Sequence, residues 1–325
     1  MLKAVLVGVG GMGGVHLNEY KNIKNVKLVA ACDVRLDMLK EKTNGNGMDI
    51  NLYSDFDEML KNENPDIVDI CTPTYMHKSM SIAALESGAN VLCEKPMALS
   101  VNDCKDVINA AEKSGKIFMA AHVVRFMNGY IYLRNIIKSG KYGKLLRLDM
   151  KRASGVPRWS WENWMLNREK SGHVVVDMMI HDIDFIQDVF GIPQDIKGVY
   201  YDMKNMTNYA SFDYIYDGFT VSAETGWYNP DVPFAAGYFA IFENGFVEYK
   251  DNILTDCGEK VDFDNTQKKT GETGINISNV DGYGAEIAYF ADCVEKGEKP
   301  DRVTIESSAT SVELALKTIE KMTKI

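Results

Sequence analysis

The sequence lacks any long apolar run, because no stretch approaches the roughly 18 residues that a membrane-spanning helix needs. Its N-terminus lacks a basic segment and a small-residue cleavage site, so we expect no secretory signal and a cytoplasmic location. The 5 histidines and 6 cysteines show no CxxC or His-containing metal spacing. We therefore expect no bound metal, and thiols that stay reduced.

Blocks of lysine and arginine are also absent, and the 46 acidic residues outnumber the 36 basic ones. A formal net charge of -10 repels nucleic acid and anionic membranes, so neither is expected as a partner. What the sequence does have is ordinary globular composition, with 46% hydrophobic and 25% charged residues. At 325 residues it exceeds the usual size of one core, so two domains are expected.

Residues 1–121 are expected to form an α/β domain with a doubly wound parallel sheet. Short β-branched runs alternate there with helical patterns, as is typical of βαβ units. The expected strands are 2–9, 26–34, 66–71, 89–93 and 116–121. The expected helices begin near Met12, Arg35, Asp55, Met76 and Ser100, several of them with a Ser or Asp cap.

Residues 122–325 are expected to form an α+β domain with a large, mainly antiparallel open sheet. After a helix near 130–139, long strands follow. Leu146, Leu148 and Met150 alternate with polar residues, which predicts a strand with one covered face.

Two hairpins are expected in this second domain, at Asp217-Gly218 and Asn244-Gly245, since these dipeptides match the twist of paired strands. Helical periodicity resumes near 285 and again over 306–322, with a turn at 297–300 between them. These final helices are candidates to pack back on the first domain.

A glycine-rich turn, Gly8-Val9-Gly10-Gly11-Met12-Gly13, follows the first expected strand and opens a helix. In that context it is the dinucleotide-binding fingerprint of a Rossmann domain. Gly8 permits the tight turn, Gly10 lets the backbone approach a pyrophosphate, and Gly13 permits close helix packing. Free N–H groups at the helix start attract the phosphate, so a nicotinamide dinucleotide is predicted as cofactor.

Asp33 ends the next strand, 20 residues after Gly13. Its carboxylate would accept hydrogen bonds from the ribose hydroxyls and repel a 2′-phosphate, so NAD is favoured over NADP. Arg35 weakens this inference and leaves NADP open.

Three further motifs follow the fingerprint in order: Cys71-Thr72-Pro73-Thr74-Tyr75-Met76-His77, Asn90-Val91-Leu92-Cys93-Glu94-Lys95-Pro96, and Asp177-Met178-Met179-Ile180-His181-Asp182-Ile183-Asp184. Over essentially the whole chain, this pattern resembles the glucose-fructose oxidoreductase and inositol dehydrogenase family, often called Gfo/Idh/MocA.

The resemblance implies that Lys95 is the active-site lysine and that a cis peptide bond precedes Pro96. It also implies that Asp177 and His181 form an acid/base pair, and Arg125 matches an arginine near the substrate of inositol dehydrogenases. Two positions depart from the family pattern, since His173 and Met179 stand where glycines are frequent. Both flank the catalytic helix, so the pocket shape is expected to differ.

Hydride transfer from an alcohol needs a base, and His181 is the best candidate because an imidazole pKa of about 6.5 is nearest to operating pH. Asp177, His181 and Asp184 are spaced i, i+4 and i+7, which predicts one helical face. Asp177 would orient His181, and Asp184 would bind a substrate hydroxyl. The alternative is a solvated face of an amphipathic helix, with Ile180 and Ile183 in the core.

Lys95 follows an apolar strand, at the edge where doubly wound sheets bind ligands; its alternative is an exposed loop lysine. Trp164 is expected to contact a sugar ring or to pack its loop. His77 is expected to line the cofactor cleft or to cap its helix, and Glu94 to anchor the cofactor or pair with Lys95. The expected cofactor set is Gly8, Gly10, Gly11, Met12, Gly13, Asp33, Val34, Arg35, Thr72, Pro73, Thr74, His77, Glu94 and Lys95.

The expected function is hydride transfer between NAD(P) and a secondary hydroxyl or ketone of a sugar, sugar derivative or cyclic polyol such as inositol, a substrate class that the resemblance supplies. Same-fold alternatives are a nucleotide-sugar dehydrogenase and a sugar oxidoreductase that recycles its cofactor. A non-catalytic NAD(P)-binding sensor is the alternative of another class. Because family members pair through such sheets, a homodimer or homotetramer is expected.

Overall fold

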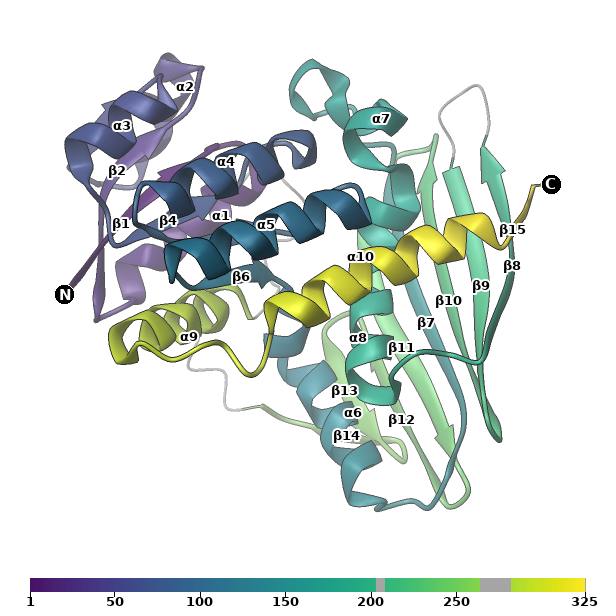
Figure 1. Cartoon of the computed structure of the whole chain (residues 1–325). Coiled ribbons are helices and arrows are strands. Elements are labelled where there is room, and N and C mark those ends of the chain that lie inside the picture. Colours follow the sequence, from purple (N-terminus) through teal and green to yellow (C-terminus); the bar gives the residue numbers. More distant parts are fainter. Residues whose placement is uncertain (203–207, 264–281, 325) are drawn as a thin grey trace. The chain divides into compact units, whose positions relative to one another are not determined.

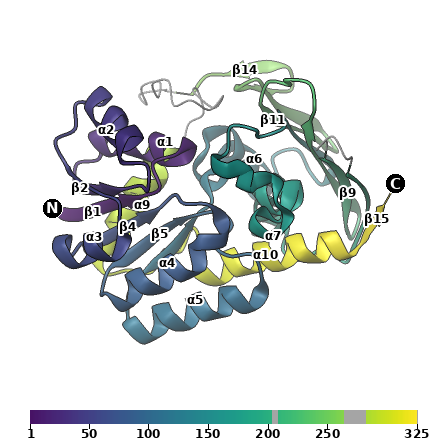
Figure 2. The same ribbon diagram turned by 90° about the horizontal axis from the view of Figure 1, so that it is seen from above.

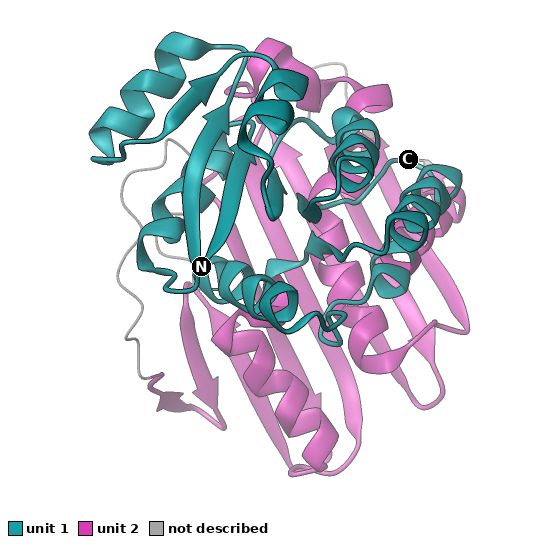
Figure 3. Ribbon diagram, turned by 60° about the vertical axis from the view of Figure 1, so that its left-hand side comes forward, with its two compact units in different colours: residues 1–123, 269–309 teal, residues 124–268, 310–325 magenta. Residues whose placement is uncertain are grey.

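Figure 1 shows the computed structural model of the chain, which describes residues 1–202, 208–263 and 282–324. The chain divides into two compact units, coloured separately in Figure 3. Unit 1 comprises residues 1–123 and 269–309, and unit 2 comprises residues 124–268 and 310–325.

Unit 1 is built on a six-stranded parallel sheet with the order β3-β2-β1-β4-β5-β6. Its strands are β1 (Leu2–Val7), β2 (Val26–Cys32), β3 (Asn51–Tyr53), β4 (Ile67–Ile70), β5 (Asn90–Glu94) and β6 (Phe118–Ala121). Strand order 3-2-1-4-5-6 is that of dinucleotide-binding doubly wound folds, so the expected fold class is confirmed. The sequence missed β3, because its three residues form no apolar run.

Helices of unit 1 connect and cover these strands. They are α1 (Gly11–Glu19), α2 (Leu36–Gly45), α3 (Phe56–Glu63), α4 (Thr74–Glu86), α5 (Val101–Ser114) and α9 (Tyr283–Lys296). Asp55 and Ser100 cap α3 and α5, since their side chains accept the backbone N–H groups of Glu58 and Asp103. In Figure 2, α4 lies beside α5, and α9 packs on α1 in the same unit.

Unit 2 is built on a nine-stranded sheet with the order β14-β13-β12-β11-β7-β10-β9-β8-β15. The strands are β7 (Leu145–Gly155), β8 (Asp195–Asp202), β9 (Asn208–Tyr216), β10 (Phe219–Tyr228), β11 (Ala235–Phe242), β12 (Gly245–Lys250), β13 (Ile253–Asp256), β14 (Glu259–Val261) and β15 (Met322–Lys324). The pairs β7–β10 and β8–β15 are parallel and the other pairs antiparallel, which confirms a mainly antiparallel sheet.

The helices of unit 2 include α6 (Asn128–Ser139), α7 (Arg168–Ser171), α8 (Ile180–Phe190) and the part of α10 (Ile305–Glu320) from residue 310 onward. Among the helices that the structure describes, none is long and apolar enough to cross a membrane.

Three details of unit 2 differ from the sequence prediction. Leu146 is 48% exposed although Leu148 and Met150 are buried, because the pairing of β7 with β11 shifts register at this point and skips Leu146. The second hairpin turns at residues 243–244, one residue earlier than expected, whereas the turn at Asp217-Gly218 is confirmed. The last helix ends at Glu320, and the chain continues as a strand paired with β8.

Candidate active site

The glycine turn between β1 and α1 has the geometry that the fingerprint requires. Gly8 has φ +83°, and a Cβ there would lie 2.7 Å from the Cys71 carbonyl oxygen. A Cβ on Gly13 would lie 1.9 Å from the Gly8 carbonyl oxygen, so neither position accepts a side chain. Above Gly10 the space is open, with an Arg35 nitrogen 3.8 Å away as the nearest atom. The turn therefore fits a pyrophosphate at the start of α1.

Asp33 lies directly after β2 and is 6% exposed. Its Oδ2 accepts the Val9 backbone N–H at 2.9 Å, which fixes the carboxylate beside the glycine turn. Arg35 donates to both carboxylate oxygens, at 3.1 and 3.3 Å. Lys42, on α2, donates to the Gly10 carbonyl oxygen at 2.6 Å. Two cations thus lie beside the acidic residue that is predicted to contact the ribose, and the sequence did not single out Lys42.

The remaining predicted cofactor residues lie at the starts of helices or in connecting segments of the same unit. Gly11 and Met12 begin α1, Pro73 is the N-cap of α4, and Val34 is 65% exposed between β2 and α2. Their contacts with the cofactor stay predictions, as do those of Thr72 and Thr74.

Lys95 follows β5 directly, at the carboxyl edge of the parallel sheet. The Lys95–Pro96 peptide bond is cis, as the resemblance implied. Glu94 is 5% exposed, and its Oε2 accepts the Lys95 backbone N–H at 3.1 Å. Burial raises the pKa of Glu94, but the neighbouring charge of His16, with smaller contributions from Lys95 and His77, lowers it overall.

His77 is buried, and its ring nitrogens lie 2.7 Å from the Pro96 carbonyl oxygen and 2.9 Å from that of Thr72. Burial lowers the pKa of this imidazole. Both contacts are with carbonyl oxygens that lie outside α4 and not with its N–H groups, so they do not cap the helix as expected. His77 instead connects the loop before α4 to the loop after β5.

The predicted catalytic helix of unit 2 begins with a π turn, Val175–Met179, and continues as α8. Asp177 lies in the middle of the π turn, and His181 in the first turn of α8. The regular α-helix predicted for residues 177–184 is therefore interrupted, because a π turn bonds i to i+5 instead of i+4. That Asp177, His181 and Asp184 share one face stays a prediction. The solvated-face interpretation is wrong, since Asp177 is 8% and Asp184 is 0% exposed.

Arg125 and Asp184, predicted separately as substrate-binding residues, bind each other in a bidentate ion pair. The Arg125 Nε and Nη2 atoms lie 2.8 and 2.7 Å from the two carboxylate oxygens. Ser311, on α10, donates to Asp184 Oδ1 at 2.8 Å. Both oxygens of Asp184 are thus engaged within the fold, which favours a structural role for it. Contact of either residue with substrate stays a prediction.

The two departures from the family pattern have different structural consequences. His173 keeps a glycine-like φ of +58°, and its Nδ1 lies 3.1 Å from the Tyr200 hydroxyl. Met179 is fully buried, and its sulfur accepts a contact from the Tyr214 hydroxyl at 3.8 Å. Met179 therefore fills core between the catalytic helix and the sheet.

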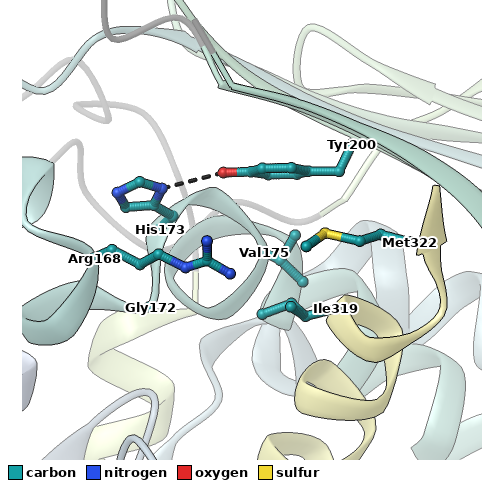
Figure 4. A pocket seen from close by; sticks show the side chains of 7 residues that line it. All are labelled: Arg168, Gly172, His173, Val175, Tyr200, Ile319 and Met322. Atoms are coloured by element: carbon teal, nitrogen blue, oxygen red, sulfur yellow. Dashed lines mark hydrogen bonds between the residues drawn. The ribbon is translucent and has the colours of Figure 1, made fainter. Parts of the chain in front are cut away.

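A small cavity lies beside His173 in unit 2 (Figure 4). Its volume is about 10 Å³, roughly the space for a single water molecule, so it does not accommodate a sugar ring. The cavity is lined by Arg168, Gly172, His173, Val175, Tyr200, Ile319 and Met322. Trp164, the predicted sugar-facing residue, is half-buried in the 3-10 segment Trp161–Leu166, and its role stays a prediction.

Sequence reasoning missed a buried ionic cluster in unit 1. His16, on α1, lies 2.9 Å from Asp69 of β4 and 3.3 Å from Glu94 of β5. The available signal was Asp69 itself, a carboxylate inside the apolar run Ile67-Val68-Asp69-Ile70 of a central strand, where an unpaired charge is costly.

Two family models match the chain. The model of an oxidoreductase family with an NAD-binding Rossmann fold matches residues 2–122, and the GFO/IDH/MocA C-terminal domain matches residues 130–241. Together they cover more than half of the chain, which therefore belongs to the Gfo/Idh/MocA family. Its first domain is an NAD-binding Rossmann domain.

Individual relatives match part of the chain. Over 192 residues it is 33% identical to a 2,7-anhydro-N-acetylneuraminate hydratase of Mediterraneibacter gnavus. The aligned region covers 59% of this chain and 50% of that protein. Over 187 residues it is 30% identical to an inositol 2-dehydrogenase of Salmonella typhimurium, 56% of this chain and 53% of that protein. The chain spans about half the length of these curated relatives.

A solved structure shows the same fold over nearly the whole chain. It is an oxidoreductase from Agrobacterium radiobacter in complex with NAD+, L-tartaric acid and magnesium. The TM-score is 0.82 at 18% sequence identity, over 98% of this chain and 96% of that chain.

Proposed function

We propose that this protein is an NAD-dependent oxidoreductase that transfers a hydride between the cofactor and a secondary hydroxyl or ketone of a sugar, sugar derivative or cyclic polyol. The observation that carries the proposal is the position of Lys95 directly after β5, at the carboxyl edge of the sheet whose glycine turn fits the dinucleotide. Ligands of doubly wound sheets bind along that edge. The relationship to an inositol 2-dehydrogenase supports the substrate class.

Three side chains handle the proton and the developing charge. In the oxidation direction His181 takes the hydroxyl proton, because the usual imidazole pKa of about 6.5 suits a base near neutral pH. Asp177 orients the His181 ring and stabilises the imidazolium. Lys95 donates a hydrogen bond to the reacting oxygen and stabilises its negative charge. Bound NAD supplies the nicotinamide carbon that accepts the hydride.

A substrate screen tests this proposal. Polyols, aldoses and nucleotide sugars are each incubated with NAD and with NADP, and the absorbance of the reduced cofactor is recorded. We expect turnover with at least one polyol or sugar, and its loss in Lys95→Met. If no compound is turned over while the wild type and Lys95→Met bind NAD equally well, the non-catalytic sensor is the better interpretation.

A second candidate is a hydratase activity on a sugar-acid derivative, which the 33% identity to an anhydro-N-acetylneuraminate hydratase favours. Addition of water leaves no net reduced cofactor. A compound that gains the mass of one water, in a reaction that requires NAD but accumulates no reduced NAD, would favour the hydratase over the dehydrogenase.

We also propose that the protein assembles as a dimer or tetramer through the sheet of unit 2. Leu146, Phe246 and Ile253 on this sheet are between 36% and 50% exposed, and their burial against a second copy of the chain would favour such a contact. Light scattering at micromolar concentration is expected to give a multiple of 36.4 kDa, and the mass of a single chain would refute the proposal.

A further inference from the structure

A cluster of ionisable side chains lies buried in unit 1, one helical turn beyond the glycine turn. His16 Nδ1 lies 2.9 Å from Asp69 Oδ2, and His16 Nε2 lies 3.3 Å from Glu94 Oε1. The Tyr20 hydroxyl donates to the same Asp69 oxygen at 3.0 Å. His16 and Asp69 are fully buried, and Glu94 and Tyr20 are each 5% exposed.

The protonation state of His16 follows from its two partners. Each ring nitrogen faces a carboxylate oxygen, and carboxylates only accept hydrogen bonds. A neutral imidazole that donates Nδ1–H to Asp69 would turn the Nε2 lone pair toward Glu94, whereas an imidazolium presents positive charge to both carboxylates. The 3.3 Å contact with Glu94 is an ion pair, because Nε2 has no hydrogen-bond partner among the described residues. Burial alone lowers the pKa of His16, but the charge and hydrogen bond of Asp69 raise it well above its usual value.

These contacts are those of an ion cluster and not of a metal centre. The thiol of Cys71 lies 3.5 Å from Asp69 Oδ1, so His16, Asp69 and Cys71 bring three potential ligands within 4.8 Å of one another. Two ligands on a tetrahedral zinc ion with bonds of about 2.0 Å stand about 3.3 Å apart. The 2.9 Å between Nδ1 and Oδ2 is instead the length of a charge-assisted hydrogen bond.

The cluster is connected to Lys95 through Glu94. Oε1 of Glu94 faces His16, and Oε2 accepts the Lys95 backbone N–H at 3.1 Å. On the other side of Lys95, the Pro96 carbonyl oxygen lies 2.7 Å from the His77 ring. The backbone of Lys95 therefore lies between Glu94, which His16 contacts, and Pro96, which His77 contacts.

We propose that His16 is a positioning residue for Lys95: as an imidazolium held by Asp69, it fixes the Glu94 carboxylate that in turn holds the Lys95 backbone. His16 touches neither substrate nor reacting atoms in this scheme. The catalytic consequence rests on the proposed function of Lys95, whereas the protonation state of His16 and the protection of the Lys95 amide do not.

The other groups that face His16 are consistent with this charge state. Cys71 and Tyr20 stay neutral, since burial raises the pKa of each well above its ordinary value. The helix α9 packs on α1, and it places the Tyr283 ring 6.2 Å from the His16 ring and carries the buried acid Glu286. Glu19, on α1 itself, has its pKa raised by burial and lowered in part by His16.

Two measurements without substrate test the protonation state of His16 and the protection of the Lys95 amide. In the NAD-bound protein labelled with ¹⁵N-histidine, the 5 histidines are assigned by single substitution and titrated between about pH 6 and 9. We expect both ring nitrogens of His16 to stay protonated throughout. In hydrogen exchange of the peptide around Lys95, the Lys95 amide is expected to be protected in the wild type and to exchange faster in His16→Gln and Glu94→Gln.

Kinetics on the substrate found by screening test the catalytic consequence of the contact between His16 and Glu94. We expect His16→Gln and Glu94→Gln each to lower kcat on the order of 10-fold to 100-fold, as displacements of a catalytic group do, and His16→Gln to change NAD affinity less than about threefold. The matched control is Tyr20→Phe, which removes one hydrogen bond to Asp69 but leaves both charges of the His16 contacts. It is expected to keep kcat and the pH profile.

The outcomes separate this proposal from the proposed function. A neutral His16 at pH near 7, or a Lys95 amide that exchanges equally in wild type and variants, overturns the positioning role whatever the enzyme does. If Lys95→Met loses turnover but His16→Gln keeps the wild-type kcat and pH profile, the positioning role is also wrong. If Lys95→Met keeps full turnover, the function proposed for Lys95 fails, while the ring titration still decides the state of His16.

Discussion

In unit 1 the buried carboxylates Asp69 and Glu94 face a histidine, whereas in unit 2 the buried Asp182 and Asp184 face arginines. The arginine pairs are bidentate, since each guanidinium contacts both oxygens of its carboxylate at 2.7 to 3.1 Å.

The two kinds of cation respond differently to pH. An arginine keeps its charge at every pH that a protein tolerates, and the carboxylates beside Arg125 raise its pKa further although burial lowers it. An imidazolium can lose its proton. Asp182 and Asp184 of unit 2 are therefore balanced by permanent charges, whereas His16, which faces Asp69 and Glu94 in the NAD-binding unit, can lose its charge.

The largest effect is expected at the predicted catalytic helix of unit 2, where His181 directly precedes Asp182. If His181 is the base, His181→Ala is expected to lower kcat by about 10²- to 10⁴-fold with little change in NAD affinity. Lys95→Met is expected to act similarly. Because both serve one proton transfer, the double variant should lose much less than the product of the single losses. Steady-state kinetics and calorimetric NAD titration measure this, and near wild-type turnover by His181→Ala across pH would rule out the assigned base.

The permanent pairs of unit 2 are tested by leaving one carboxylate without its cation. Arg125→Met is expected to reduce the free energy of unfolding by about 3 to 5 kcal/mol, because Asp184 then stays buried without a counter-charge. The matched control is Arg147→Met, which breaks the exposed pair with Asp149 in the same unit and is expected to cost about 0 to 1 kcal/mol. Urea unfolding compares the two. Equal losses would show that burial does not distinguish these pairs.

The titrating pair of unit 1 is tested by the pH dependence of its contribution. Because the pKa of folded His16 lies above its unfolded value of about 6.5, the contribution is complete below that value and is lost as pH rises through the folded pKa. Asp69→Asn is thus expected to cost about 1.5 to 3 kcal/mol near pH 6 and less at high pH. Scanning calorimetry of both proteins across pH measures this difference, whereas the cost of Arg125→Met should stay constant over the same range. A cost of Asp69→Asn that does not vary with pH would show that His16 does not titrate.

The smallest expected effect concerns the choice between NAD and NADP. In unit 1 the negative charge of Asp33 disfavours a 2′-phosphate, whereas the positive charges of Arg35 and Lys42 favour it. We expect NAD to bind on the order of tenfold more tightly than NADP, since the cations offset part of the repulsion between Asp33 and a 2′-phosphate. Asp33→Ser should reverse this preference and Arg35→Ala should widen it. Fluorescence titration with both cofactors decides, and equal or tighter NADP binding by the wild type would show that the cations dominate.

The parallel sheet was predictable because strands buried on both faces must be apolar along their whole length, as Ala4, Val5 and Leu6 of β1 are. The glycine turn was predictable for a steric reason, since a Cβ on Gly8 or Gly13 would overlap backbone atoms. The register shift that exposes Leu146 was not, because it depends on how β11 pairs with β7. Nor was the π turn at Asp177, for its residues are compatible with an ordinary α-helix.

By itself, the sequence determined which groups are present and much of the local structure that carries them: the glycine turn, the lysine after β5, and the histidine and aspartates of the predicted catalytic helix. Only the tertiary structure decided which of the charged side chains contact each other. His16 and Asp69 are 53 residues apart in the chain, Arg125 and Asp184 are 59 apart, and Ser311 reaches Asp184 over 127 residues. Periodicity and capping act over a few residues, whereas a buried carboxylate is neutralised by whichever cation packing brings within hydrogen-bond distance.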